Sequence, residues 1–244
     1  VDEITRRFVR AGKNCVVFCR ARTGEELPRS DYGRQLVYVK GSRHRKLDTF
    51  VSSCQTGWHL LRNRRQHTYV FWFKNSNLPG IMLTWLARLP MSVNTDGLEW
   101  RRAKWSWPFK LYYFLSSFLI AKVCRSLIAD SRAIQSYYQN RFGADSDMIP
   151  YGAPARIEIG RERSQAILDR LNLERDRYFL QITRFEPDNL PYETGTAFQQ
   201  SGLAQEGYAM VIIGYQGPTL YADTVMALHG CNGVRVLNAT YDPE

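Results

Sequence analysis

Apolar runs of strand length recur along this chain, and segments of helical spacing separate them. In the first part of the chain the expected strands are 14–20, 35–41, 68–73, 91–97, 126–131 and 146–154. The expected helices are 1–12, 46–63, 78–89, 108–125 and 132–143. Short apolar strands that alternate with helices are typical of parallel sheets covered on both faces. The pattern therefore predicts an α/β fold.

Two of these helices have a distinct apolar spacing. Residues 1–12 place Ile4, Phe8 and Ala11 on one helical face, with arginines opposite. The segment 46–63 has helical spacing through a set of larger side chains: Leu47, Phe50, Val51, Cys54, Trp58 and Leu61. Such spacing is typical of amphipathic helices.

The pattern pauses after Pro154 and then restarts. Expected helices 161–173, 192–202 and 219–230 alternate with expected strands 177–184, 208–214 and 233–238. The pause predicts two Rossmann-like domains, 1–154 and 155–244. The chain opens in a helix without the strand that should precede it, and it completes only three strands of the second sheet. We therefore expect an N-terminal strand and a C-terminal part to be missing.

Composition and charge narrow the class of partner. The 244 residues have a formal net charge of +10 and are 44% hydrophobic, which is typical of a globular chain with a core. The positive charge favours nucleic acid, an anionic membrane face or phosphorylated small molecules. No apolar stretch reaches the ~18–20 residues of a membrane span. Because the opening residues are charged, we expect no signal peptide.

The cysteines and histidines do not have the spacing of a metal site. Cys15 and Cys19 lie too far apart along one predicted strand to form a disulfide, so we expect reduced thiols and a cytoplasmic protein. The four histidines show no ligand spacing, and the acidic pair Asp145 and Asp147 precedes a strand instead of ending one. We therefore expect no bound metal.

The densest candidate chemistry lies in "NTDGLEWRRAKW", residues 94–105, at the end of a predicted strand. Ligands bind parallel α/β sheets at this end, where Asp96 can orient or deprotonate a substrate hydroxyl. Nearby cations can meet phosphate, and tryptophans can stack on a sugar or lie at a lipid interface: Arg101, Arg102, Lys104, Trp100, Trp105 and Trp107. The alternative is a solvated helix start with Asp96 as N-cap and tryptophans lining the core.

Two loops of the second half follow predicted strands in the same way. Arg184 lies just past a strand with Asn189 close behind, where a cation can pair with a diphosphate beside a helix N-terminus. The alternative is a surface arginine paired with Glu186. Gly214 ends the next strand and permits close approach of a nucleotide to the backbone, although a plain turn is equally compatible with it.

These motifs resemble those of a known family. "NTDGLEWRRAKW" is similar to the N-x-DGLEW-[KR]-R-x-KW signature of bacterial family-4 glycosyltransferases of the rhamnosyltransferase type, which have a DUF1972-like N-terminal domain. The resemblance extends through "LIADSRAIQSYYQNRFG" and "MIPYGAP". "RYFLQITRFEPDN" is similar to the start of the family's second domain, and "VRVLNATYDPE" also fits.

The resemblance implies the GT-B architecture, in which two Rossmann-like domains face each other across a cleft, and no required metal ion. It implies retaining sugar transfer by front-face attack. The donor, dTDP-rhamnose in preference to a UDP-sugar, would bind the second domain. The acceptor, a lipid-diphosphate-linked saccharide, would bind the first at the inner face of the cytoplasmic membrane, where the protein would be peripheral. No nucleic-acid partner is implied.

The resemblance also assigns roles by position. The acceptor side is expected to comprise the catalytic Asp96 with Glu99, Trp100, Arg101 and Lys104. The donor side is expected to comprise Arg184, which would neutralise the diphosphate, with Asn189, Gly214, Tyr151 and Gly152. The family's Gly-rich loop and its paired glutamates are not in this sequence. The alternative is therefore a non-catalytic relative that binds polyanions.

Overall fold

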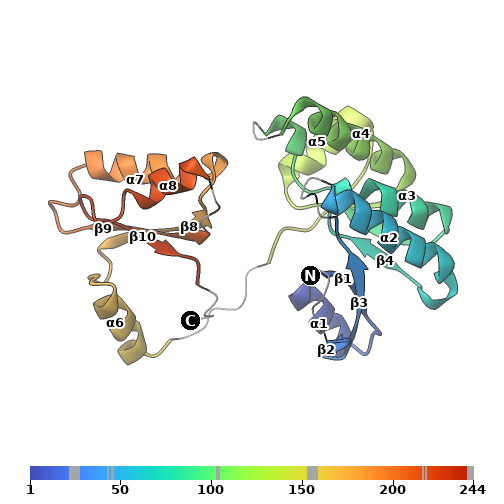
Figure 1. The fold of residues 1–244 in the computed structure, drawn as a ribbon, viewed down its shortest axis with the longest axis horizontal. Coiled ribbons are helices and arrows are strands. Elements are labelled where there is room, and N and C mark those ends of the chain that lie inside the picture. Colours follow the sequence, from blue (N-terminus) through green and yellow to red (C-terminus); the bar gives the residue numbers. More distant parts are fainter. Residues whose placement is uncertain are drawn as a thin grey trace. The chain divides into compact units, whose positions relative to one another are not determined.

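The computed structural model describes residues 1–21, 28–42, 44, 47–102, 105–152, 159–215, 217 and 219–240. The chain divides into two compact units, Val1–Gly152 and Ala153–Glu244. In each unit, helices lie against sheets whose strands are mainly parallel (Figure 1). The predicted α/β fold is confirmed.

Each helix that the sequence predicted for the first unit is present. These helices are α1 (Asp2–Arg10), α2 (Asp48–Arg62), α3 (Leu78–Leu86), α4 (Trp107–Val123) and α5 (Arg132–Phe142). The strands are β1 (Val16–Ala21), β2 (Ser30–Asp31), β3 (Arg34–Lys40), β4 (Val70–Trp72), β5 (Met91–Asn94), β6 (Ser126–Ala129) and β7 (Asp147–Met148). Short 3₁₀ helices are η1 (Arg64–Gln66), η2 (Asn75–Asn77) and η3 (Glu99–Arg101).

The strands of the first unit form two sheets, of order β1-β3-β2 and β4-β5-β6-β7. The second sheet is wholly parallel, and its strand β5 is buried along its length. The antiparallel pair β2–β3 was not predicted. Tyr32 and Gly33 both have positive φ, as a two-residue hairpin turn of type I′ requires, but Tyr is an unusual residue at the first of these positions. The strand expected over 146–154 is only two residues long.

The apolar face predicted for α2 is largely the exposed one. Leu47, Phe50 and Trp58 are each about half exposed, while the buried residues of the helix include Ser52 and Ser53. The reason is the close approach of α2 to α3. A Cβ on Gly57 would lie 2.7 Å from the Cα atom of Gly80, so only small side chains fit between the helices. The hydroxyl of Ser53 accepts a hydrogen bond from the Gly80 N–H at 2.8 Å.

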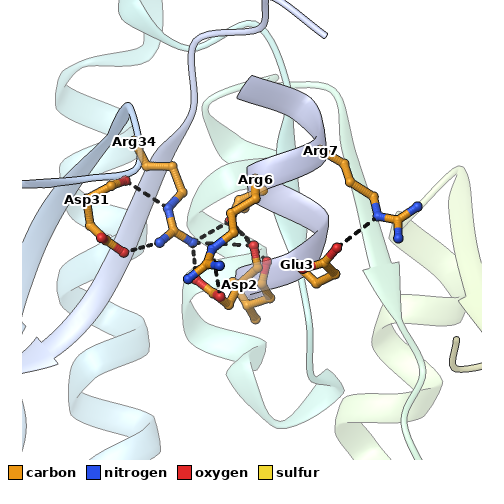
Figure 2. Close-up of polar contacts among 8 residues, drawn as sticks. Asp2, Glu3, Arg6, Arg7, Asp31 and Arg34 are labelled. Carbon is orange, nitrogen blue, oxygen red and sulfur yellow. Dashed lines mark hydrogen bonds and ion pairs between the residues drawn. The ribbon is translucent and has the colours of Figure 1, made fainter. Parts of the chain in front are cut away.

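Helix α1 is attached to the β2–β3 hairpin mainly by charge (Figure 2). Its predicted apolar face is not buried, because Ile4 and Phe8 are exposed. Arg34 of β3 is only 4% exposed and pairs with the carboxylates of Asp2 and Asp31. The Arg34 guanidinium also donates to the Thr5 hydroxyl at 3.0 Å. The hydrogen bond that Arg34 donates to the Asp2 carboxylate, together with nearby positive charge, lowers the pKa of Asp2.

The second unit has one parallel sheet covered on both faces. Its elements are α6 (Arg161–Arg170), β8 (Tyr178–Arg184), η4 (Pro187–Asn189), α7 (Pro191–Gln200), β9 (Ala209–Tyr215), α8 (Leu220–Met226) and β10 (Val234–Asn238). The sheet order is β10-β9-β8. Helices α7 and α8 lie on one face and α6 on the other (Figure 1). Alternate residues of β9 therefore enter two cores: Met210 and Ile212 in one, Ala209 and Val211 in the other.

Candidate functional site

Polar side chains from four segments meet at the carboxyl edge of the sheet β4-β5-β6-β7. Lys74 follows β4, Asn94 ends β5 with Asp96 two residues on, Asp130 follows β6, and Tyr151 follows β7. Parallel strands end at the same edge, so these residues are brought together although 77 positions separate the first from the last in the sequence. We call this group the carboxyl-edge cluster.

Electrostatic coupling within the cluster centres on Asp96. Burial raises the pKa of the Asp96 carboxyl; the charges of Glu99 and Asp130 add to this, while the Lys74 ammonium and a backbone hydrogen bond at Gly97 oppose it. Desolvation and the charges of Asp96 and Asp130 also raise the pKa of Tyr151, against a hydrogen bond between its hydroxyl and the Asn94 side chain. A carboxylate with a raised pKa is a better proton acceptor near neutral pH.

The backbone at the end of β5 is held in an uncommon conformation. Asp96 has φ of 54°, in the left-handed region, and its N–H donates to Oδ1 of Asn94 at 2.9 Å. Thr95 is fully buried, and both its N–H and its hydroxyl donate to the carbonyl of Ile128, at 2.9 and 3.1 Å. Asp96 is therefore not the N-cap of a helix: the N-cap of α4 is Ser106.

Glu99 organises the loop that follows. Its Oε1 accepts a hydrogen bond from Arg102 at 3.1 Å, and its Oε2 accepts one from the indole N–H of Trp105 at 2.6 Å. Because both carboxylate oxygens have partners within the loop, the structure gives Glu99 a positioning role. The acceptor-side role expected for it stays a prediction.

The aromatic side chains of this loop pack mainly on their own unit. Trp100 lies 5.7 Å from Phe114 and 5.8 Å from Tyr137, measured between ring centroids. Arg101 lies over the Tyr137 ring at 5.1 Å. Trp105 packs 5.3 Å from Tyr113. Trp100 and Trp105 thus agree with the alternative in which tryptophans line the core, whereas Trp107 is 73% exposed. Lys104, expected on the acceptor side, lies outside the described residues.

In the second unit, Arg184 ends β8 and Asn189 lies close to it. The donor-binding roles expected for both residues stay predictions. The side-chain amide of Asn189 donates to the carbonyl of Arg184 at 3.0 Å. The Arg184 guanidinium lies 3.5 Å from the Glu186 carboxylate, as in the surface-pair alternative, and its side chain is 58% exposed. A surface ion pair of this kind is weak enough for an anion to compete with it.

Gly214 is required for a structural reason that the sequence did not reveal. A Cβ at this position would collide with the carbonyl of Thr183 and lie 2.8 Å from the Phe185 ring. The glycine is therefore required by the pairing of β8 with β9. Its expected contact with a nucleotide stays a prediction.

Tyr151 and Gly152 were expected on the donor side. The structure brings Tyr151 to the carboxyl-edge cluster of the first unit, next to Asn94 and Asp96. A Cβ at Gly152 would meet no atom within 4 Å. Lys74 and Asp130 were not predicted as site residues. Lys74 directly follows the predicted strand 68–73, and that position was its signal; Asp130 lies near the end of the predicted strand 126–131.

Among the described residues, no group of three or more His, Cys, Asp and Glu side chains is arranged to hold a metal ion. No described helix is long and apolar enough to cross a membrane. All five cysteines are free thiols.

Comparison with known proteins places this geometry in context. The family described as "Domain of unknown function (DUF1972)" matches residues 87–154, which contain every member of the carboxyl-edge cluster except Lys74. This agrees with the domain expected from the signature. No curated protein matches the chain.

Solved structures match over most of the chain. HepE from Anabaena, in complex with UDP, has a TM-score of 0.58 and 13% identity over 87% of this chain and 58% of its own. TarM has a TM-score of 0.53 and 11% identity over 79% of this chain and 37% of its own. UGT89C1 from Arabidopsis thaliana, complexed with UDP-L-rhamnose, has a TM-score of 0.52 and 10% identity over 97% of this chain and 65% of its own.

The fold is that of the GT-B glycosyltransferases. This confirms the predicted fold class, and the chain spans between about a third and two thirds of the length of the three structures described. A shared fold does not define the sugar or the acceptor, which depend on the site.

Proposed function

We propose that this chain acts in a retaining glycosyltransferase that moves a sugar, with rhamnose favoured, from a nucleoside-diphosphate sugar to a lipid-linked saccharide. The observation that carries the proposal is the carboxyl-edge cluster, in which a half-buried carboxylate lies beside a cation and hydrogen-bonding groups in a GT-B fold. The DUF1972 match and the signature at residues 94–105 support it.

In this proposal the first unit binds the acceptor. Asp96 orients the attacking hydroxyl and accepts a hydrogen bond from it, and Lys74 attracts the acceptor's phosphates. The acceptor oxygen forms a bond to the anomeric carbon on the face from which the nucleoside diphosphate departs, and the proton passes to the leaving diphosphate. Arg184 in the second unit stabilises the negative charge that develops on this leaving group.

Calorimetric titration with dTDP, UDP, GDP and ADP tests the donor half. We expect selective binding of one nucleotide and a loss of about tenfold or more in Arg184→Ala, the size of one charge-assisted contact. Arg170→Ala, which removes an exposed arginine of α6, is the matched control and should bind normally. Equal and salt-sensitive binding of all four nucleotides, indifferent to Arg184, would instead support the polyanion-binding alternative.

A UDP-sugar is the second candidate donor. Two of the three structures described above carry UDP or UDP-L-rhamnose, and this supports a UDP-sugar as the alternative to dTDP-rhamnose. The same titration separates the two candidates, because each predicts a different preferred nucleotide.

Asp96→Asn tests the acceptor half. Transfer from the donor that the titration selects should fall by about 10²-fold, the usual cost of misplacing a reacting hydroxyl. Nucleotide affinity should not change, because Asp96 belongs to the other unit. If the Asp96→Asn variant transferred sugar at the unaltered rate, Asp96 would have no role in the mechanism.

A further inference from the structure

Helix α4 has the reverse of the polarity expected for a helix in water. Its buried residues are Ser116, Ser117 and one large apolar residue, Ile120. The Asn75 amide of η2 donates to the Ser117 hydroxyl at 2.9 Å. The outward residues of α4 are large and apolar: Trp107, Leu111, Leu115 and Phe118, all exposed. At 3.6 residues per turn these four positions fall within an arc of about 80°. They form one continuous stripe.

Helix α2 of the same unit has a similar arrangement. It buries Ser52, Ser53, Thr56 and Gly57 together with Leu60, and it exposes Phe50, Trp58 and its N-cap Leu47. Phe50 packs edge-on against Tyr112 of α4, with 6.5 Å between ring centroids, so the two stripes adjoin. We call the exposed side chains the α2–α4 surface: Leu47, Phe50, Trp58, Trp107, Leu111, Leu115 and Phe118.

Small and polar residues between helices, with large apolar ones outside, are typical of helices in contact with lipid. A water-exposed helix has the opposite arrangement. Neither α2, with 15 residues, nor α4, with 17, is long enough to cross a bilayer. Their apolar stripes are suited to lying in the plane of an interface.

Charge indicates which apolar partner covers this surface. In the sequence, residues 40–66 and 107–125 contain ten Lys and Arg but a single acid, Asp48. Two of these cations lie on aromatic rings of the surface: Arg62 is 5.0 Å from the Trp58 ring and Lys122 is 5.9 Å from the Phe118 ring. A second copy of the chain would bring two such basic borders together, whereas anionic headgroups attract them.

We propose that the α2–α4 surface docks the protein on an anionic lipid bilayer, with its apolar side chains at the boundary between headgroups and acyl chains. The inference gives the proposed acceptor, a lipid-linked saccharide, a membrane surface from which to reach the first unit, and to that extent it rests on the proposed function. It depends on different residues from the carboxyl-edge cluster, so vesicle binding and nucleotide binding can fail separately.

Vesicle co-sedimentation tests the docking. The probes are vesicles of phosphatidylcholine alone and of phosphatidylcholine with about 30% phosphatidylglycerol. We expect binding to the anionic vesicles and a decrease of about tenfold or more in the double variant Leu115→Glu/Phe118→Glu, because two apolar side chains are lost from the interface. Leu220→Glu, at an 85% exposed leucine of the second unit, is the matched control and should bind normally.

A charge variant tests the basic border independently of packing. Arg64→Gln/Arg65→Gln should lower affinity for anionic vesicles about tenfold and leave affinity for neutral vesicles unchanged. Arg161→Gln/Arg170→Gln, an equal charge change in the second unit, should have little effect. Tryptophan fluorescence should be quenched by brominated lipid, and Trp107→Phe should remove part of that quenching.

The proposal is overturned if the unaltered protein ignores anionic vesicles, or if Leu115→Glu/Phe118→Glu and Leu220→Glu bind alike. It is also overturned if light scattering shows a dimer that the Leu115→Glu/Phe118→Glu variant dissociates, since a second copy would then cover the surface. Nucleotide titration of the same variant should be unchanged. A loss of both activities together would indicate misfolding and is checked by circular dichroism.

Discussion

At the scale of single residues, Asp96 lowers the stability of the first unit. A left-handed backbone is unfavourable for most residues other than Gly, although Asn and Asp tolerate it better than the rest, and burial beside Glu99 and Asp130 is unfavourable for a carboxylate. Residues that lower stability in this way are concentrated at functional sites. The backbone conformation and burial of Asp96 therefore point to a functional role independently of its match to the family signature.

The stability of Asp96→Asn tests this reasoning. A folded-state pKa raised above the ordinary value means that ionised Asp96 destabilises the fold at neutral pH, and that this cost disappears as the pH falls. Asn tolerates the left-handed backbone and carries no charge. We expect Tm at pH 7 to rise by about 2–4 °C, which corresponds to ~1 kcal/mol, and the gain to vanish below about pH 4. Calorimetry measures Tm, and a lower Tm for Asp96→Asn at pH 7 would contradict the destabilising role of the ionised carboxylate.

At the scale of elements, α1 and the α2–α3 pair are held by different forces. Helix α1 buries none of its residues and is attached through Asp2, Arg34 and Asp31. The α2–α3 contact, in contrast, depends on the absence of side chains at Gly57 and Gly80. The two contacts should therefore respond to different perturbations.

Acid should detach α1. Because the pKa of Asp2 is lowered in the folded state, its contribution is present above the ordinary carboxyl pKa of about 3.9 and is lost as the pH falls through the depressed value. Hydrogen exchange should show decreased protection of α1 amides at that pH, and in Asp2→Asn already at pH 7. Glu3→Gln is the control, since Glu3 pairs only with Arg7 of the same helix in the described structure, and it should leave protection intact. Equal effects of the two variants would exclude the ionic attachment.

A methyl group at Gly80 should separate α2 from α3. The Cβ would lie 2.6 Å from the carbonyl oxygen of Ser53 and would also collide with the Trp72 ring. We expect Gly80→Ala to destabilise the first unit by about 1–3 kcal/mol in urea unfolding, the usual cost of overpacking. Gly152→Ala, which meets no atom within 4 Å, should change stability by less than about 0.5 kcal/mol.

At the scale of the whole molecule, the net charge of +10 and the proposed nucleotide site make separable contributions to the binding of anionic ligands. Raising the salt concentration from about 0.05 to 0.5 M should weaken heparin binding about a hundredfold or more, because counterion release dominates it. Selective nucleotide binding should weaken by less than about tenfold, since it rests on a few directed contacts. If both fell in parallel, the polyanion-binding alternative would be preferred to sugar transfer.

Local pattern was sufficient for the helices, for most of the strands and for the position of the main loop, but not for the hairpin strand β2. The helices and strands follow from apolar periodicity and from stop signals such as Gly143, which has the left-handed φ of a helix C-terminus. Ligands bind at the carboxyl ends of parallel strands, and this rule predicted a site at residues 94–105. These properties depend on residues close in sequence.

The tertiary structure decided which residues meet. Lys74, Asp130 and Tyr151 join Asp96 only because four strands pair in register, and Gly214 is required by the neighbouring strand β8. The sequence identified the apolar face of α2, but not the environment of that face, because the side that is buried depends on the close approach of α3. Periodicity is a property of one segment, whereas burial depends on the neighbours of that segment. The sequence by itself therefore determined the helices and most of the strands, while packing determined the cluster and the exposed α2–α4 surface.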